Sequence, residues 1–250
     1  MIVGILGCGS IANILINELK DDEDIKLKYF YDNDIEQSKK LAKIADGIAT
    51  DNFELMVDKS DLIIEAASPR AVGLFIENTL KKGKSVVIMS VGYLMDVNNR
   101  KNLERIAKKN NAQIYLPSGA IVGLDGLKAA SIGKIESVTL TTRKSPRSIG
   151  SNGKKEIIFD GKASEAVKIF PTNINVAAAL SIASNMDINV KIIIDPEINR
   201  NIHEVHVKGE FGSFTSKTEN VPSNINPKTS VLAAYSAVNL LKSLNKTIHI

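Results

Sequence analysis

Three small residues near the start of the chain have the spacing of a phosphate-binding turn. Gly7, Gly9 and Ala12 follow an apolar run at residues 2–6 and open a helical pattern of apolar residues. Glycines in such a turn permit a tight bend and close backbone approach, and the helix N-terminus offers N–H groups to a pyrophosphate. The residues expected to contact a dinucleotide here are Gly7, Gly9, Ser10 and Ile11.

An acidic residue follows at the distance typical of a ribose-binding carboxylate. Asp32 lies 20 residues beyond Ala12, just past an apolar stretch at residues 26–31. A carboxylate there accepts hydrogen bonds from the adenosine ribose and repels a 2′-phosphate. The pattern therefore predicts NAD as the cofactor, with NADP as a second cofactor that the site can accept. Asn33 and Asp34 stay open as alternative ribose-binding residues.

Two of the three histidines lie in one alternating segment, residues 201–207. In a regular strand His203 shares a face with Val205 and Val207, whereas His206 lies on the more polar face. A covered imidazole can have its pKa tuned for proton transfer. From the residues alone, a histidine that is merely packed in the core is the commoner explanation, and both interpretations stay open.

Small residues also end the strands that would border a flat nicotinamide ring. They occur at residues 66–69, 90–92 and 117–120, and Ser68 is the polar residue expected to contact the cofactor in the first of these turns. Such residues let a ring lie close to the backbone. Ordinary loops with small side chains explain each turn equally well.

Two asparagines, Asn173 and Asn175, stand at an expected helix start. One of them can cap the helix, and the other can offer its amide to a ligand. No HExxH, CxxC or paired His/Cys spacing occurs in the sequence. We therefore expect no catalytic metal.

Composition narrows the class of protein. The 250 residues are 44% hydrophobic and 24% charged, as in ordinary globular domains. The net charge of +4 comes from scattered lysines without interleaved aromatic residues, which argues against nucleic acid as a partner and favours an anionic small-molecule substrate. A single cysteine, Cys8, together with the lack of a basic leader or a long apolar run, predicts a cytoplasmic protein with no membrane contact.

The elements that would position these residues follow two rhythms. Strands expected at 2–6, 26–31, 61–65, 85–89 and 112–116 alternate with helices at 10–20, 34–45, 69–82 and 97–109, which predicts a doubly wound parallel sheet of the Rossmann type. After Pro117 we expect a helix at 122–132, a strand at 134–142, a loop at 144–155 and helices at 162–169 and 175–185. Strands at 188–194, 201–208 and 211–218 should then form an antiparallel meander.

The predicted fold class is thus α/β, with an N-terminal Rossmann domain and a smaller α+β domain whose sheet is largely antiparallel. The expected boundaries are 1–118 for NAD binding and 119–227 for substrate binding, catalysis and dimerisation. A helix at 228–244 is expected to be able to pack back on the first domain. The strands between residues 188 and 218 present more apolar surface than the few neighbouring helices can bury. We therefore expect this surface to be covered in a homodimer.

Taken together, these segments resemble the L-aspartate dehydrogenase family over essentially the whole chain. The matching segments are GILGCGSIA at 4–12, EAASPRAV at 65–72, MSVGYL at 89–94, PSGAIVGLDGLKAA at 117–130, TTRKSPRS at 141–148, FPTNINVAAALS at 170–181 and DPEINRNIHEV at 195–205. The glycine motif is generic, and the combination of the later segments is specific. Two departures, Arg70 and Ser145, lie outside the expected chemistry.

The resemblance implies NAD-linked oxidation of L-aspartate to iminoaspartate, followed by hydrolysis to oxaloacetate and ammonia, at the start of NAD biosynthesis. It implies that His203 is the catalytic histidine, with a pKa near neutrality. It also implies that Ala120 and one asparagine, Asn175 in preference to Asn173, line the nicotinamide site.

The two carboxylates of such a substrate need cationic or N–H partners. Arg143 and Lys144 are the candidates, with Ser118 as a further polar candidate. A solvated loop explains the two basic residues equally well. Two other classes also fit the sequence: a two-domain reductase resembling dihydrodipicolinate reductase or homoserine dehydrogenase, and a non-catalytic NAD-binding sensor that would not need His203.

Overall fold

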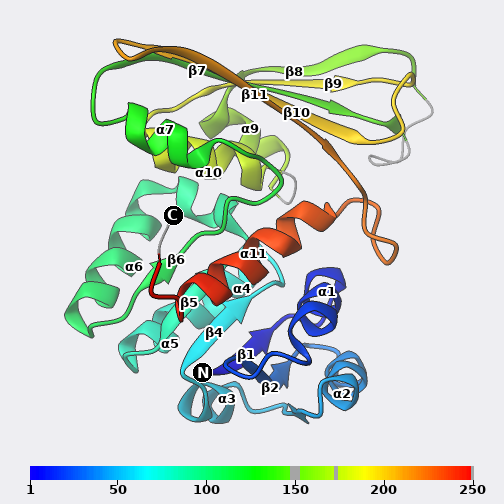
Figure 1. Ribbon diagram of the computed structural model, residues 1–250, viewed down its shortest axis with the longest axis vertical. Helices are drawn as coiled ribbons and strands as arrows, with labels where there is room; N and C mark the ends of the chain where they lie inside the picture. Colours follow the sequence, from blue (N-terminus) through cyan, green and yellow to red (C-terminus); the bar gives the residue numbers. More distant parts are fainter. Residues whose placement is uncertain (147–152, 172–173, 249–250) are drawn as a thin grey trace. The chain divides into compact units, whose positions relative to one another are not determined.

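The computed structural model describes residues 1–146, 153–171 and 174–248 (Figure 1). The chain divides into two compact units, Met1–Pro117 together with Ala234–Ile250, and Ser118–Ala233. Each unit has its own sheet and its own buried apolar residues. No helix among the described residues is long and apolar enough to cross a membrane.

The first unit is built on a six-stranded parallel sheet with strand order β3-β2-β1-β4-β5-β6. The strands are β1 Ile2–Leu6, β2 Lys26–Tyr31, β3 Ile48–Ala49, β4 Leu62–Glu65, β5 Ser85–Ile88 and β6 Ile114–Tyr115. The order reverses between β1 and β4, and ligands of doubly wound sheets bind at the carboxyl ends of the strands beside that reversal. The predicted Rossmann architecture is confirmed.

Helices cover both faces of this sheet, as the apolar character of its strands requires. They are α1 Ser10–Leu19, α2 Ile35–Ile44, α3 Phe53–Lys59, α4 Pro69–Ala71, the π-helical turn η1 Val72–Ile76, α5 Glu77–Lys81, the 3₁₀ turn η2 Val91–Met95, α6 Val97–Lys109 and α11 Val231–Ser243. The core unites Leu15 and Leu19 of α1, Phe30 of β2, and Ala237 and Leu241 of α11, all of which are buried. The last helix of the chain therefore contributes to the core of the first unit.

The second unit contains a five-stranded mixed sheet with strand order β11-β10-β7-β9-β8. Its strands are β7 Ile135–Lys144, β8 Glu156–Lys162, β9 Asn189–Ile194, β10 Asn201–Gly209 and β11 Gly212–Asn220. The pairs β11–β10, β10–β7 and β9–β8 are antiparallel, and β7–β9 is parallel. The predicted meander is wrong: β7 lies between β9 and β10, so of the three strands expected in the meander only β10 and β11 pair with each other.

Three helices lie on one face of this sheet: α7 Leu124–Ala130, α9 Ala163–Ile169 and α10 Asn175–Ser184 (Figure 1). On the strand β10 the residues Val205 and Val207 are buried, while Glu204, His206 and Lys208 are exposed. The exposed face of β10 is therefore polar. The surplus of apolar surface from which we expected a homodimer is not present on this strand.

Candidate active site

The glycine turn of the first unit has the geometry that its sequence predicts. Gly7 follows β1 with a φ of +98°, and a Cβ there would lie 2.6 Å from the Cβ of Ala67. Gly9 is the N-cap of α1, and a Cβ built on it meets no described protein atom within 4 Å. Only glycine fits the first position, whereas the second is open on the side that a ligand would approach.

The helix that follows directs its N-terminus at this turn. Ser10 and Ile11 form the first turn of α1, and no side chain caps the helix. The first turn of α1 contains no acidic residue that would offset the positive end of the helix dipole from within the helix. An open glycine beside an uncapped helix N-terminus fits a diphosphate.

Asp32 lies next to the same turn. Its Oδ2 accepts a hydrogen bond from the backbone N–H of Cys8 at 2.7 Å, and its Oδ1 accepts one from the N–H of Asp34 at 3.0 Å. Asp34 instead caps α2, with its Oδ1 accepting from the N–H of Glu36. Of the residues proposed to bind the ribose, Asp32 is therefore the one held against the glycine turn.

The thiol of Cys8 lies buried within this turn. Burial, and secondarily the negative charge of Asp32, raise the pKa of its thiol to about 12. The thiol is therefore protonated near neutral pH, as expected of a small buried residue.

Ser68 marks the turn after β4. Its Oγ accepts a hydrogen bond from the N–H of Ala71 and caps the helical segment that begins with α4. Its own N–H donates to the carboxylate of Glu65, the last residue of β4. Glu65 is completely buried, and sequence reasoning did not single it out, although one acid inside the apolar run of residues 62–65 was a signal.

In the second unit, His203 lies on the helix-covered face of β10, as the alternation predicted. It pairs across the sheet with Thr142 of β7, and its Nδ1 lies 3.0 Å from the Thr142 Oγ1. His206 is exposed and contacts the Oγ1 of Thr215 instead. The two histidines are thus in different environments on opposite faces of one strand.

The turn that contains Ala120 is tied to the strand beside His203. The carbonyl of Ala120 accepts hydrogen bonds from the Thr218 Oγ1 at 3.0 Å and from the Asn220 Nδ2 at 3.1 Å. Thr218 is the residue of β11 that pairs with His203. The strand register therefore brings the backbone of Ala120 and the imidazole of His203 to the same part of the second unit.

Arg143 and Lys144, the two residues expected to bind substrate carboxylates, lie in different environments. Strand β7 continues to Lys144, two residues beyond the predicted end, so both residues belong to a strand and not to a solvated loop. Alternation then places Lys144 on the same face as Thr142 and His203, and Arg143 on the other. Only Lys144 shares the face of the histidine.

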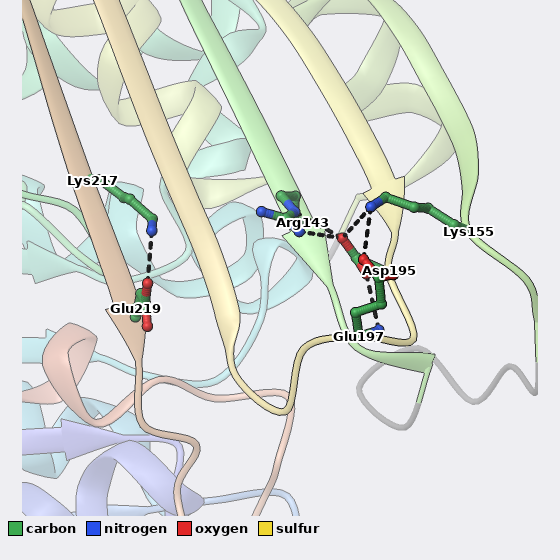
Figure 2. Close-up of polar contacts among 6 residues, drawn as sticks. All are labelled: Arg143, Lys155, Asp195, Glu197, Lys217 and Glu219. Carbon is green, nitrogen blue, oxygen red and sulfur yellow. Dashed lines mark hydrogen bonds and ion pairs between the residues drawn. The ribbon is translucent and has the colours of Figure 1, made fainter.

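Arg143 is already engaged within the protein. Figure 2 shows its guanidinium group directed at the fully buried carboxylate of Asp195, which Lys155 also approaches at 3.5 Å. The hydrogen bond from Arg143 is the main reason that the pKa of Asp195 lies below its usual range. The charge of Arg143 is thus compensated by an internal ion pair.

The charge of Lys144 affects the titration of His203. Burial, reinforced by the positive charge of Lys228, lowers the pKa of Lys144 to about 8. Burial, reinforced by Lys144, lowers the pKa of His203 to about 4. The near-neutral pKa expected for His203 is therefore wrong for the protein without ligand, because desolvation and a neighbouring cation both oppose protonation of the imidazole.

Asn201 adds an acceptor to this face. It lies two residues before His203 on β10, and its Oδ1 is buried without a hydrogen-bond partner among the described residues. Asn201 and Ser145 also line a cavity of about 270 Å³ together with residues of the 222–227 loop. A buried oxygen without a donor is costly unless a ligand supplies one.

The remaining predicted residues are placed less distinctively. Asn175 is the first residue of α10 and is partly buried, while the N-cap position belongs to Ile174. Ser118 is partly buried at the start of the second unit. Asn173 lies outside the described residues. No group of three or more potential metal ligands occurs in the described part of the chain.

Sequence reasoning also missed Thr142, Thr218 and Asn220. Thr142 becomes recognisable once β7 is known to reach Lys144, because the two residues then share a strand face. The roles of Thr218 and Asn220 depend on the path of a turn about a hundred residues away in the sequence. No local pattern indicates them.

Comparisons with known proteins cover both units. The C-terminal family model of aspartate dehydrogenase matches residues 125–244, and the NAD-binding domain model of homoserine dehydrogenase matches residues 7–117. An L-aspartate dehydrogenase from Methanothermobacter thermautotrophicus is 55% identical over 252 residues, covering 100% of this chain and 98% of the relative. One from Methanosarcina mazei is 42% identical over 99% of this chain and 98% of its own length.

Solved structures agree with this result. The crystal structure of aspartate dehydrogenase from Thermotoga maritima matches with a TM-score of 0.82 and 32% identity, covering 100% of this chain and 99% of that one. Biliverdin reductase from Synechocystis, at 13% identity with a TM-score of 0.59 over 100% of this chain and 92% of that one, shares the fold alone.

A Rossmann unit with an open glycine turn, followed by a second unit with a partly buried histidine, defines the class of pyridine-nucleotide-dependent oxidoreductases. Within this class the full-length matches are decisive, because they include both units and exceed 30% identity. The chain belongs to the L-aspartate dehydrogenase family.

Proposed function

We propose that this protein is an NAD-dependent L-aspartate dehydrogenase. One observation supports the substrate most directly: Lys144, Thr142, His203 and Asn201 lie together on the covered face at one end of the second sheet. The set comprises a cation, a proton acceptor and an unpaired carbonyl oxygen. These groups can bind the amino group and one carboxylate of an amino dicarboxylate.

Lys144 is the proposed partner of a substrate carboxylate. No described acidic side chain pairs with it, and its neighbour Lys228 adds further positive charge. A carboxylate bound here would form a charge-assisted hydrogen bond and would relieve the repulsion between the two lysines. The Oδ1 of Asn201 is the proposed acceptor for the substrate amino group.

His203 is the proposed proton acceptor. At neutral pH its imidazole is uncharged, and in the tautomer with hydrogen on Nδ1 it donates to the Thr142 Oγ1 and leaves Nε2 with a lone pair. Nε2 can then take a proton from the substrate ammonium group and later from the water that attacks the imine. A substrate carboxylate beside Lys144 would offset the lysine charge, which would raise the pKa of His203 toward neutrality when the proton must be held.

The overall reaction is a two-electron oxidation. A bound pyridine nucleotide supplies the hydride acceptor. The α-carbon of aspartate loses hydride and its C–N bond becomes C=N, giving iminoaspartate; water addition then breaks the C–N bond and yields oxaloacetate and ammonia. The carboxylate of Asp32 beside the glycine turn supports NAD over NADP, because it would repel a 2′-phosphate.

We further propose a homodimer, a cytoplasmic setting, and supply of iminoaspartate to NAD biosynthesis. Family membership supports the last two, and the buried, protonated Cys8 is compatible with a reducing compartment. The second sheet supports the dimer: the described helices of this unit lie on one of its faces, so its other face can meet a second copy across a two-fold axis. Light scattering should then give twice the chain mass of 27.1 kDa, and a monomer mass would refute the dimer.

The two histidines of β10 provide the test of the residue roles. His203→Ala should lower turnover with L-aspartate by about 10²- to 10⁴-fold, as expected for loss of a general acid–base. His206→Ala, on the exposed face, is the matched control and should turn over near the wild-type rate. If His203→Ala instead lowers thermal stability and retains activity per folded molecule, the histidine is only a packing residue.

A further inference from the structure

The carboxylate of Glu65 has no part in the chemistry described so far. Glu65 ends β4, and its side chain has no exposed surface. None of the described basic side chains pairs with it, and burial raises its pKa. A buried acid without a cation is costly, so the surrounding structure must compensate for it.

Four hydrogen bonds provide this compensation. The Oε1 of Glu65 accepts from the N–H groups of Ala67 and Ser68, both at 2.9 Å, and from the Ser90 Oγ at 2.8 Å; its Oε2 accepts from the Ser90 N–H at 2.9 Å. All four partners can donate, and three of them are backbone N–H groups that cannot accept. These bonds stabilise the ionised carboxylate and oppose the effect of burial on its pKa.

These bonds connect two different turns. Ala67 and Ser68 belong to the turn after β4, and Ser90 belongs to the turn after β5. In a doubly wound sheet, each half on either side of the strand reversal binds one mononucleotide. The glycine turn and Asp32 mark the adenosine half at β1 and β2. The turns held by Glu65 lie in the other half, where this rule would place the nicotinamide nucleotide.

We propose that Glu65 is a positioning residue that holds these two turns as one surface for the nicotinamide and, through its negative charge, favours the oxidised cofactor over the reduced one. The oxidised ring carries a positive charge and the reduced ring is neutral. A fixed anion beneath that surface therefore interacts differently with the two forms. This inference rests on pyridine-nucleotide binding by the first unit and not on the identity of the substrate.

Calorimetric titration of the full chain with NAD⁺, NADH and ADP-ribose tests the proposal. Glu65→Gln removes the charge and sets an NH2 group against one of the four donors, so it should weaken both cofactor forms, and NAD⁺ by about tenfold more than NADH, as expected for a unit charge within about 10 Å at an effective dielectric constant of about 20. ADP-ribose, which lacks the nicotinamide, should bind as it does to the wild type. Equal weakening of NAD⁺ and NADH, or no weakening, would overturn the proposed charge effect.

Two further variants separate charge from shape. Glu65→Asp keeps the charge and should keep the wild-type ratio of the two affinities. Ser90→Ala removes one of the two bonds to the turn after β5, so it should weaken both cofactor forms alike; unchanged affinity for both would overturn the positioning role. Failure of ADP-ribose to bind the wild type would instead refute dinucleotide binding itself.

A measurement on the wild type covers the case in which neither Glu65 variant folds. The infrared difference spectrum between the NAD⁺ and NADH complexes, recorded with isotopically labelled glutamate, should show a shifted carboxylate stretch. Labelled spectra that are identical in the two complexes would contradict an interaction between Glu65 and the nicotinamide charge.

Discussion

Lys144→Met should make the protein more stable and a poorer enzyme. The ammonium group of Lys144 lies on the covered face of β7, where burial and Lys228 lower its pKa from 10.5 to about 8. Each pKa unit corresponds to about 1.4 kcal/mol, so keeping this group charged costs at most about 3.5 kcal/mol. Because Lys144 is only partly buried, we expect the variant to gain about 1 to 3 kcal/mol, or a few degrees in Tm.

The pH dependence of this gain has a definite sign. Below pH 8 Lys144 is charged in both the folded and the unfolded chain, and the full cost is present. Between pH 8 and 10.5 the folded chain binds fewer protons than the unfolded one, so the stability of the wild type rises with pH. The advantage of Lys144→Met should therefore be constant below pH 8 and should disappear by about pH 10.5.

Catalysis should change in the opposite direction. Methionine cannot donate to a substrate carboxylate, and loss of a hydrogen bond between charged groups should raise the KM for L-aspartate by about 10- to 100-fold. The pKa of His203 should also rise in the free enzyme. It should stay below 6.5, because burial is the main reason that this pKa is lowered. Denaturant unfolding, initial rates and NMR titration of His203 measure these three effects.

Lys208→Met is the matched control. Lys208 is exposed on the other face of the same sheet and pairs with Glu136, so its replacement should change stability by less than about 0.5 kcal/mol and leave KM unchanged. A Lys144→Met protein that is less stable than the wild type at pH 7, or that keeps its affinity for aspartate, would refute the role given to Lys144.

The cofactor turn yields two further predictions. Gly7→Ala should destabilise the fold by about 2 to 4 kcal/mol, because its positive φ and its contact with Ala67 exclude a side chain, whereas Gly9→Ala should melt like the wild type and bind cofactor at least about tenfold more weakly; equal melting temperatures for the two variants would contradict this. Asp32→Ala should weaken NAD(H) and narrow its advantage over NADP(H), whereas Asp32→Asn, which keeps an acceptor for the Cys8 N–H, should narrow the preference with less loss of affinity. Titrations of both Asp32 variants with NAD(H) and NADP(H) measure these effects. An unchanged NAD preference would assign the ribose contact to Asn33 or Asp34.

The first unit was largely predictable because its physics is local. Parallel strands buried on both faces appear as short apolar runs, and the runs at residues 2–6 and 85–88 are strands in the structure. β3 has two residues and α3 has seven, which is too short for a periodic pattern. They were missed for that reason.

The second unit was less predictable because strand pairing depends on distant partners. The expected meander assumed that consecutive strands are neighbours, whereas the structure inserts β7 between β9 and β10. β8 was missed because its sequence, EIIFDGK, has no regular alternation. This strand is stabilised by pairing with β9, some thirty residues later in the chain, which no local sequence pattern indicates.

The candidate site divides in the same way. Strand alternation alone placed His203 and His206 on different faces, and motif spacing alone indicated Asp32, with Asn33 and Asp34 as alternatives. Distinguishing Lys144 from Arg143 required the true end of β7, and the buried carboxylate of Glu65 could be interpreted only with its four donors known. Sequence patterns located the chemistry, and the sheet register determined which side chains share a face.

The most direct test of the proposed function is reduction of NAD⁺ by the purified protein with a panel of amino acids. The panel should include L-aspartate, D-aspartate, L-glutamate, L-asparagine and L-alanine, with formation of the reduced nicotinamide followed by absorbance. The arrangement of Lys144, Asn201 and His203 predicts turnover with L-aspartate and little or none with L-alanine or L-asparagine, which lack the second carboxylate. Equal turnover across the panel, or none with L-aspartate while NAD⁺ binds, would contradict it.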